Sequence, residues 1–348
     1  MALTTSYVNA TTAKLNREDL SDIISVVDAK STVLTSSIKK GKKPASAYEE
    51  WIVDKYDSTV ITGTIDGSDV SSSTTFFDST ANRSRIGNYI QTFRRVPQVS
   101  RLQEVVAAPA GVNNPDPNGV AGATEFARAK AKATVQIKRD MEAALLSNNG
   151  AVADNGSSTA YTTRGLGKWL STSADSNALG QSAVLLASGQ VNVSSTSGAL
   201  ASFNEDALRS LLQARWTVSG QQKDLIAIVN PGIKNTVSDF TRYLPSKTNI
   251  NTVRFFNQDV ADKQVSTTVD FYSGDYGNVE LHLSAFLPTS NGNVGYILDM
   301  DYLELRTALA PSFMPLPDQG GGPRGIVEAI VALAYLNPTS GCKIDVAS

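Results

Sequence analysis

The sequence is poor in residues that bind metals, form disulfides or carry out acid–base chemistry. Its 348 residues include one cysteine, Cys342, and one histidine, His282. A single cysteine excludes an internal disulfide framework, and the two residues together cannot form the usual Cys/His zinc sites. A Ser-His-Asp triad would need His282, which lies in an alternating apolar pattern typical of a structural strand. We therefore expect no metal, no cofactor and no enzymatic activity.

The sequence also has little net charge and no long hydrophobic run. It carries 31 Lys and Arg against 33 Asp and Glu, and only 18% of its residues are charged. Near-neutrality argues against a free nucleic-acid-binding domain, which is normally strongly basic. The longest apolar stretch, 325–336, contains Glu328 and is too short to span a bilayer. The first residues lack the basic head and apolar core of a signal peptide, so we expect cytosolic synthesis and no membrane partner.

The N-terminal 100 residues resemble extensions more than a domain. Residues 1–44 form a predicted arm that ends in a basic hinge, where Lys39, Lys40, Lys42 and Lys43 surround Gly41. Residues 45–100 contain two strand-forming runs separated by a tip at 62–80 that is rich in Ser, Thr, Gly and Asp. A two-stranded ribbon of this length cannot bury both faces alone. We therefore expect it to contact another subunit.

The middle of the sequence carries the clearest helix signals. Residues 124–146 contain no Gly or Pro and repeat apolar side chains every three or four positions, with Arg128, Lys132, Arg139 and Glu142 on the opposite side. Asn204 is a predicted N-cap of a second helix, and Asn230 with Pro231 ends a short buried strand before a third.

In the last third of the sequence, apolar and polar residues alternate as they do in β-strands. Predicted strands lie at 265–271, at 279–287, at 296–305 and at 326–336, the last apolar on both faces as in the centre of a sheet. Asp299, Asp301 and Glu304 are placed on a solvated strand face with nothing opposing them, and a calcium site is the alternative.

An arginine cluster is the main candidate contact surface. Arg83, Arg85, Arg94, Arg95 and Arg101 have no acid among them, and Tyr89 and Phe93 are interleaved. Such a pattern can imitate a nucleic-acid surface, but overall neutrality favours a charge patch between subunits. The predicted subunit contacts are Trp51, Arg85, Tyr89, Phe93, Arg94, Arg95, Lys39 and Lys40.

The order of these parts resembles the Hong Kong 97-type major capsid protein of tailed bacteriophages. The similarity runs through nearly the whole sequence and rests on six segments: Tyr48–Asp54, Arg85–Ser100, Gln136–Leu146, Ile228–Pro231, Tyr276–Pro288 and Val327–Gly341. No segment carries a catalytic signature, so the specificity lies in their order.

The resemblance implies an α+β capsid fold with an N-terminal arm, an extended β-loop, a spine helix with a peripheral β-sheet, and an axial α/β domain. The implied ranges are 1–44 for the arm, 45–100 for the extended loop, 101–200 for the peripheral domain with a spine helix at 123–146, 201–290 for the axial domain, and 291–348 for return strands completing both domains.

The implied function is a major capsid protein that assembles into hexamers and pentamers of an icosahedral shell. The shell would enclose double-stranded DNA, contacted weakly and without sequence specificity, because tight phosphate binding would oppose packaging. Scaffolding, portal and decoration proteins are candidate partners, and the subunit would assemble in the bacterial cytoplasm before residing in the virion. The alternatives are an encapsulin-like compartment shell and a ring-forming tail component.

Overall fold

The computed structural model describes residues 28, 30–54, 56, 59–67, 83–106, 125–170, 203–240, 269–287 and 293–346. The chain divides into two compact units. The smaller unit comprises Met1–Ala29, Val96–Ala133 and Pro315–Ile326, and the larger comprises Lys30–Arg95, Thr134–Met314 and Val327–Ser348. Most of the expected ribbon tip, 68–80, lies outside the described residues.

A four-stranded sheet of order β1-β9-β10-β4 contains the strand predicted to be central. Its strands are β1 (Lys39–Lys40), β9 (Leu303–Leu316), β10 (Arg324–Tyr335) and β4 (Gln91–Arg95). β10 lies between β9 and β4, and its residues from 331 to 335 are all buried. β4 is antiparallel to β10, whereas β1 is parallel to β9. The predicted central position of this strand is confirmed.

Strand β1 corrects the expected basic hinge. Lys39 and Lys40 are strand residues opposite Glu304 and Leu305, and the Gly41 N–H donates to the Leu305 carbonyl at 3.0 Å. The run of lysines is therefore attached to a sheet edge at this point, because backbone pairing outweighs repulsion between two exposed ammonium groups.

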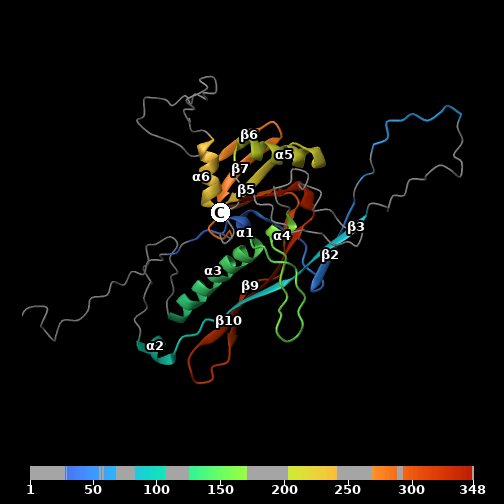
Figure 1. The fold of residues 1–348 in the computed structure, drawn as a ribbon. Coiled ribbons are helices and arrows are strands. Elements are labelled where there is room, and N and C mark those ends of the chain that lie inside the picture. Colours follow the sequence, from blue (N-terminus) through green and yellow to red (C-terminus); the bar gives the residue numbers. More distant parts are fainter. Residues whose placement is uncertain are drawn as a thin grey trace, which may run out of the picture. The chain divides into compact units, whose positions relative to one another are not determined.

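A five-stranded sheet follows the order β11-β8-β5-β7-β6. Its strands are β5 (Asp224–Val229), β6 (Phe271–Gly274), β7 (Gly277–Leu283), β8 (Asn293–Leu298) and β11 (Cys342–Val346). Helices α5 (Glu205–Ser219) and α6 (Pro231–Asp239) lie beside it in Figure 1. Leu211, Leu212, Ile233 and Val237 of these helices share a buried cluster with Val229 and other strand residues.

The strand predicted over 296–305 is wrong, because it consists of two strands in different sheets. β8 ends at Leu298 and β9 begins at Leu303. Between them the chain turns, with the Asp299 carboxylate accepting from the Asp301 N–H at 3.0 Å and the Asp299 carbonyl accepting from the Tyr302 N–H at 3.3 Å. A short Asp side chain that binds its own backbone two residues on favours a turn over a continuing strand.

The predicted helix cap at Asn204 is confirmed, and Asn230, predicted to end a strand, also caps a helix. The Asn204 side chain accepts from the Ala207 N–H at 2.8 Å, and the Asn230 side chain accepts from the Ile233 N–H at 3.0 Å. Pro231 occupies the first turn of α6, where a missing N–H costs nothing.

Helix α3 (Glu125–Leu145) matches the predicted helix within a residue at each end. Ile137, Met141 and Leu145 are buried, as their spacing predicts. Glu142 was expected on the solvated side, but it is fully buried. Its two carboxylate oxygens accept the first N–H groups of the short helix α1 (Val33–Ser37), from Leu34 at 2.7 Å and from Thr35 at 2.8 Å. A helix start offers unpaired N–H groups and positive potential, which compensates the burial of this charge.

The smaller unit is held by contacts between a short helix and a loop. Helix α2 (Arg101–Val106) begins beside the loop around Asp318, with Arg101 Nη2 to Asp318 Oδ2 at 2.6 Å. The Val99 N–H donates to the Pro323 carbonyl at 3.2 Å. Gly322 has φ of 121°, and a Cβ there would collide with the Val99 carbonyl oxygen, so this position requires glycine.

Candidate subunit interface

The ribbon expected from the sequence is formed by β2 (Tyr48–Val53) and β3 (Ser84–Tyr89). The two strands are antiparallel, and their register places Tyr48 opposite Tyr89. Exposure alternates along β2, so that Tyr48, Glu50 and Ile52 face outward while the residues between them are partly covered. The ribbon therefore has one face attached to its own chain and one face available for contact.

Trp51 anchors the covered face of the ribbon. Its ring centroid lies 5.7 Å from that of Trp169 and 5.3 Å from the Arg306 guanidinium. Arg306 also forms an ion pair with Glu49, and only 11% and 13% of these two side chains are exposed. Separating this largely desolvated pair would leave a charge uncompensated, so the pair and the cation–π contact together fix the position of β2.

Aromatic rings continue this anchor at the base of the ribbon. The Tyr89 ring lies 4.6 Å from that of Tyr48 and 5.6 Å from that of Tyr161. The Arg164 guanidinium lies 4.7 Å from the Trp169 ring centroid. Burial lowers the pKa of Arg164, and burial together with Glu50 raises the pKa of Tyr48. The base is thus a packed aromatic cluster in which Trp51 and Tyr89 already have partners within the chain.

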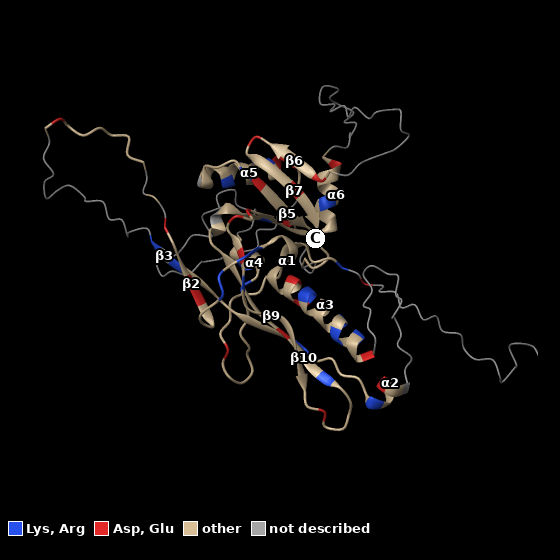
Figure 2. Ribbon diagram, turned by 180° about the vertical axis from the view of Figure 1, so that it is seen from behind, with Lys and Arg blue, Asp and Glu red and all other residues tan. Residues whose placement is uncertain are grey.

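The arginines of the predicted patch meet acids of their own chain. Arg95 forms a bidentate contact with Asp140 at 2.7 and 2.8 Å, and this hydrogen bonding raises the pKa of the guanidinium. Arg94 Nη2 lies 3.2 Å from Glu328. The remaining pairs are Arg83 with Asp54 at 3.0 Å, Arg85 with Glu50 at 4.0 Å, and Arg101 with Asp318. Figure 2 shows both charge signs on β2 and β3.

The other predicted contact residues differ widely in exposure. Phe93 is 7% exposed and lies in β4 opposite Ala329, which makes it a core residue of the four-stranded sheet in the single chain. Lys39 is exposed but pairs with Asp301 at 2.6 Å. Lys40 is exposed, and the Arg85 side chain is 73% exposed. Contact with a second subunit stays a prediction for all of them.

Sequence reasoning missed the most exposed apolar surface as a contact candidate. Beyond β2, the side chains of Tyr56, Val60, Ile61 and Ile65 are 81–98% exposed, and Ile52 on the outer ribbon face is 66% exposed. We call these five residues the ribbon apolar run. The signal available in the sequence was the dense set of β-branched residues from 59 to 65, which has no α-helical or alternating pattern to bury it within the chain.

The acidic residues near 300 are placed differently from the expectation. Asp299 is 2% exposed and lies 3.0 Å from Lys223 Nζ and 3.8 Å from Arg215 Nη2, so cations oppose it. Asp301 is exposed and paired with Lys39 and Lys223, which lowers its pKa. Within the described ranges, no group of three or more His, Cys, Asp and Glu residues is arranged to hold a metal ion.

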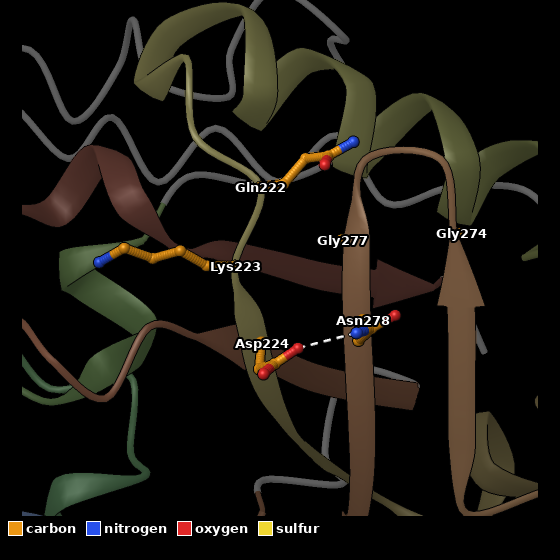
Figure 3. A pocket seen from close by; sticks show the side chains of 6 residues that line it. All are labelled: Gln222, Lys223, Asp224, Gly274, Gly277 and Asn278. Carbon is orange, nitrogen blue, oxygen red and sulfur yellow. Dashed lines mark hydrogen bonds between the residues drawn. The ribbon is translucent and has the colours of Figure 1, made fainter.

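A polar pocket of about 260 Å³ lies at one end of the five-stranded sheet (Figure 3). Gln222, Lys223, Asp224 and Asn278 line it together with Gly274 and Gly277. The Asp224 carboxylate accepts from Asn278 Nδ2 at 2.8 Å, and the Lys223 side chain points away from this pair. The polar groups of the pocket are therefore engaged with one another or with residues outside it.

The chain is similar in fold to solved structures from phages and from capsids. The Gordonia phage Cozz structure is 13% identical with a TM-score of 0.53, and the match covers 100% of this chain and 99% of that one. The Cyanophage A-1(L) capsid is 14% identical over 98% and 100%, with a TM-score of 0.59. A capsid of an empty GTA particle is 13% identical over 99% and 100%, also at 0.59. The fold is the α+β Hong Kong 97-type capsid fold, as the resemblance implied.

The sequence matches one protein family over nearly its whole length. The model of the SU10 major capsid protein family matches residues 4–348, and the chain belongs to this family. It is a structural subunit of a virion capsid and associates with copies of itself. No curated protein matches the sequence. In the part of the chain that the structure describes, no helix is long and apolar enough to cross a membrane.

Proposed function

We propose that the chain forms hexamers and pentamers of an icosahedral shell around double-stranded DNA, and that it has no enzymatic activity. The ribbon and the N-terminal arm are its contacts to neighbouring copies. Assembly takes place in the bacterial cytoplasm, and the domain ranges are those given for the arm, extended loop, peripheral domain, axial domain and return strands. Scaffolding, portal and decoration proteins are further candidate partners.

The ribbon apolar run is the observation that supports this contact most strongly. One face of β2 is fixed to its own chain through Trp51 and Glu49, whereas Val60, Ile61 and Ile65 project into solvent. Contiguous exposed apolar side chains of this kind are typical of an interaction surface. Burial against a second copy would remove them from water, and the fixed base would hold the ribbon in a constant direction.

The charges of the ribbon favour contacts made by shape and apolar area. Because Arg94 and Arg95 are already neutralised by Glu328 and Asp140, a neighbouring copy need not supply acids for them. Exposed pairs of this type contribute little to affinity and more to orientation. Lys40 and Arg85 remain the cations best placed to meet a neighbour.

Electron microscopy of the purified full-length protein tests the proposal. We expect closed shells built from six-fold and five-fold rings, and nuclease-protected double-stranded DNA in particles from infected cells. Open tubes or single rings would favour a tail component instead, and shells that enclose cargo enzyme without DNA would favour a compartment protein. A protein that stays monomeric at high concentration would contradict shell assembly.

A further inference from the structure

Two short chain segments that join the two sheets lie next to each other. The first linker, residues 299–302, leads from β8 to β9, and the second, residues 336–341, leads from β10 to β11. The Leu336 N–H donates to the Tyr302 carbonyl at 2.8 Å, which bonds one linker to the other. Any rotation of one sheet against the other must pass through this pair of linkers, as in other hinges built from residues at the ends of elements.

Arg215 of helix α5 contacts both linkers with one guanidinium group. Its Nε donates to the Ser340 carbonyl at 2.7 Å, and its Nη2 lies 3.8 Å from Asp299 Oδ2. The Arg215 side chain is 1% exposed and that of Asp299 is 3% exposed. A buried charge is costly unless it is paired, so each of these groups strongly favours the arrangement that keeps the other in reach.

Lys223 extends these contacts toward the surface. Its Nζ lies 3.0 Å from Asp299 and 3.4 Å from Asp301, and it lies 4.6 Å from the Tyr302 ring centroid. Figure 3 shows the side chain leaving the polar pocket in the opposite direction from Asn278. Burial lowers the pKa of Lys223, but its contacts with Asp299 and Asp301 outweigh burial and raise it.

Lys39 of strand β1 is the outermost of the three cations, after Arg215 and Lys223, that contact this pair of aspartates. Its Nζ lies 2.6 Å from Asp301 Oδ1. The exposed fraction of the cations rises outward along the series, from 1% for Arg215 to 23% for Lys223 and 57% for Lys39. The inner contacts are thus shielded from solvent and salt, whereas the outer contact is screened and weak.

We propose that Arg215 clamps the two linkers between the sheets, that Lys223 holds the first linker beside it, and that Lys39 connects the N-terminal arm to this clamp. When β1 is attached, Asp301 and the first linker are held, and the hinge is stiff. When β1 leaves, Asp301 loses one of its two cations, and the first linker moves more freely while Arg215 keeps both linkers in contact. Attachment of the arm therefore limits the movement of the first linker, while Arg215 limits the movement of both. This control acts within a single chain, whether or not a shell forms.

Hydrogen exchange of the full-length protein, read by mass spectrometry, tests the outer step. Lys39→Gln removes the cation and keeps β1, and Lys40→Gln is the matched control because Lys40 has no ion pair within the described residues. We expect exchange at 299–302 to be roughly two- to fivefold faster in Lys39→Gln than in the control, the range that an exposed ion pair supports. At 1 M salt the exchange rate of 299–302 in the parent protein should approach the rate in Lys39→Gln, and the rate in Lys39→Gln should itself change little. Equal exchange in the two variants would overturn the link to the arm.

The contacts of Arg215 with the two linkers are tested by a separate variant. Asp299→Asn removes the charge that faces Arg215 and Lys223 and keeps the side-chain volume, and we expect exchange to rise in both linkers together. A rise confined to 299–302 would refute the clamp, because Arg215 would then not couple the linkers. If Asp299→Asn fails to fold by circular dichroism, Arg215→Lys provides the same comparison with the same two outcomes, because it keeps a cation but loses the fork that reaches both linkers.

Discussion

Replacing Val60 and Ile61 of the ribbon apolar run with serine should weaken assembly without weakening the subunit. These side chains are 84% and 98% exposed, so their loss should change the free energy of unfolding of the subunit by less than about 0.5 kcal/mol. Full burial of a Val or Ile side chain contributes about 1.5–3 kcal/mol. If a neighbouring copy buries even half of this pair, the contact loses about 2 kcal/mol, or roughly thirtyfold in the association constant.

The critical concentration for shell assembly measures this loss. Light scattering and sedimentation against protein concentration should show a rise of roughly thirtyfold for the double variant, while thermal unfolding of the unassembled subunit stays at the parental temperature. Thr64→Ser, in the same segment, is the matched control and should behave as the parent. Assembly of the double variant at the parental concentration would refute the assignment of this surface, and a lowered unfolding temperature would show that the side chains are covered within the chain.

Three further perturbations test other contacts. Glu142→Gln should speed hydrogen exchange at the first amides of α1, including Leu34, because the loss of a buried charge-assisted hydrogen bond costs about 1.5–3 kcal/mol; unchanged exchange there would contradict its capping role. Burial raises the pKa of Cys342 to about 12, so a thiol reagent at pH 8 should label only unfolded protein. The stability contributed by this group is fully present below the ordinary thiol pKa and is lost as the pH rises toward 12. Arg95→Met should lower stability by at most about 1 kcal/mol, and this difference should shrink in high salt because the pair with Asp140 is half exposed; a larger, salt-independent loss would show that the pair is structurally buried.

Local signals in the sequence were enough for the helices and their caps. The periodicity of 124–146 predicts α3 almost to the residue, and Asn204 caps its helix as its position indicates. These features depend on neighbours within a few residues, which periodicity and capping rules describe directly. The two paired ribbon strands were predictable in part: β2 is shorter than the predicted run, and the returning run is divided between β3 and β4, which belong to different sheets.

Contacts between distant segments were not predictable in this way. Glu142 looks like a solvated residue on its helix, and only the arrival of α1, more than a hundred residues earlier in the chain, buries it. Asp299 likewise looks like a strand residue until Arg215 and Lys223 are brought to it. Trp51 was predicted as a contact, but its partners Trp169 and Arg306 come from two other regions, and no local pattern connects them.

The topology of the two sheets determines when the chain can fold during its synthesis. The five-stranded sheet needs β11, which ends at Val346, and the four-stranded sheet needs β10, which ends at Tyr335, so each sheet is completed by a strand made late in synthesis. The ribbon and α3 are made much earlier. Because many of these pairings join distant residues, completion of the sheets should be slow. A nascent chain thus has no finished body to present to a growing lattice until β10 and β11 have been made.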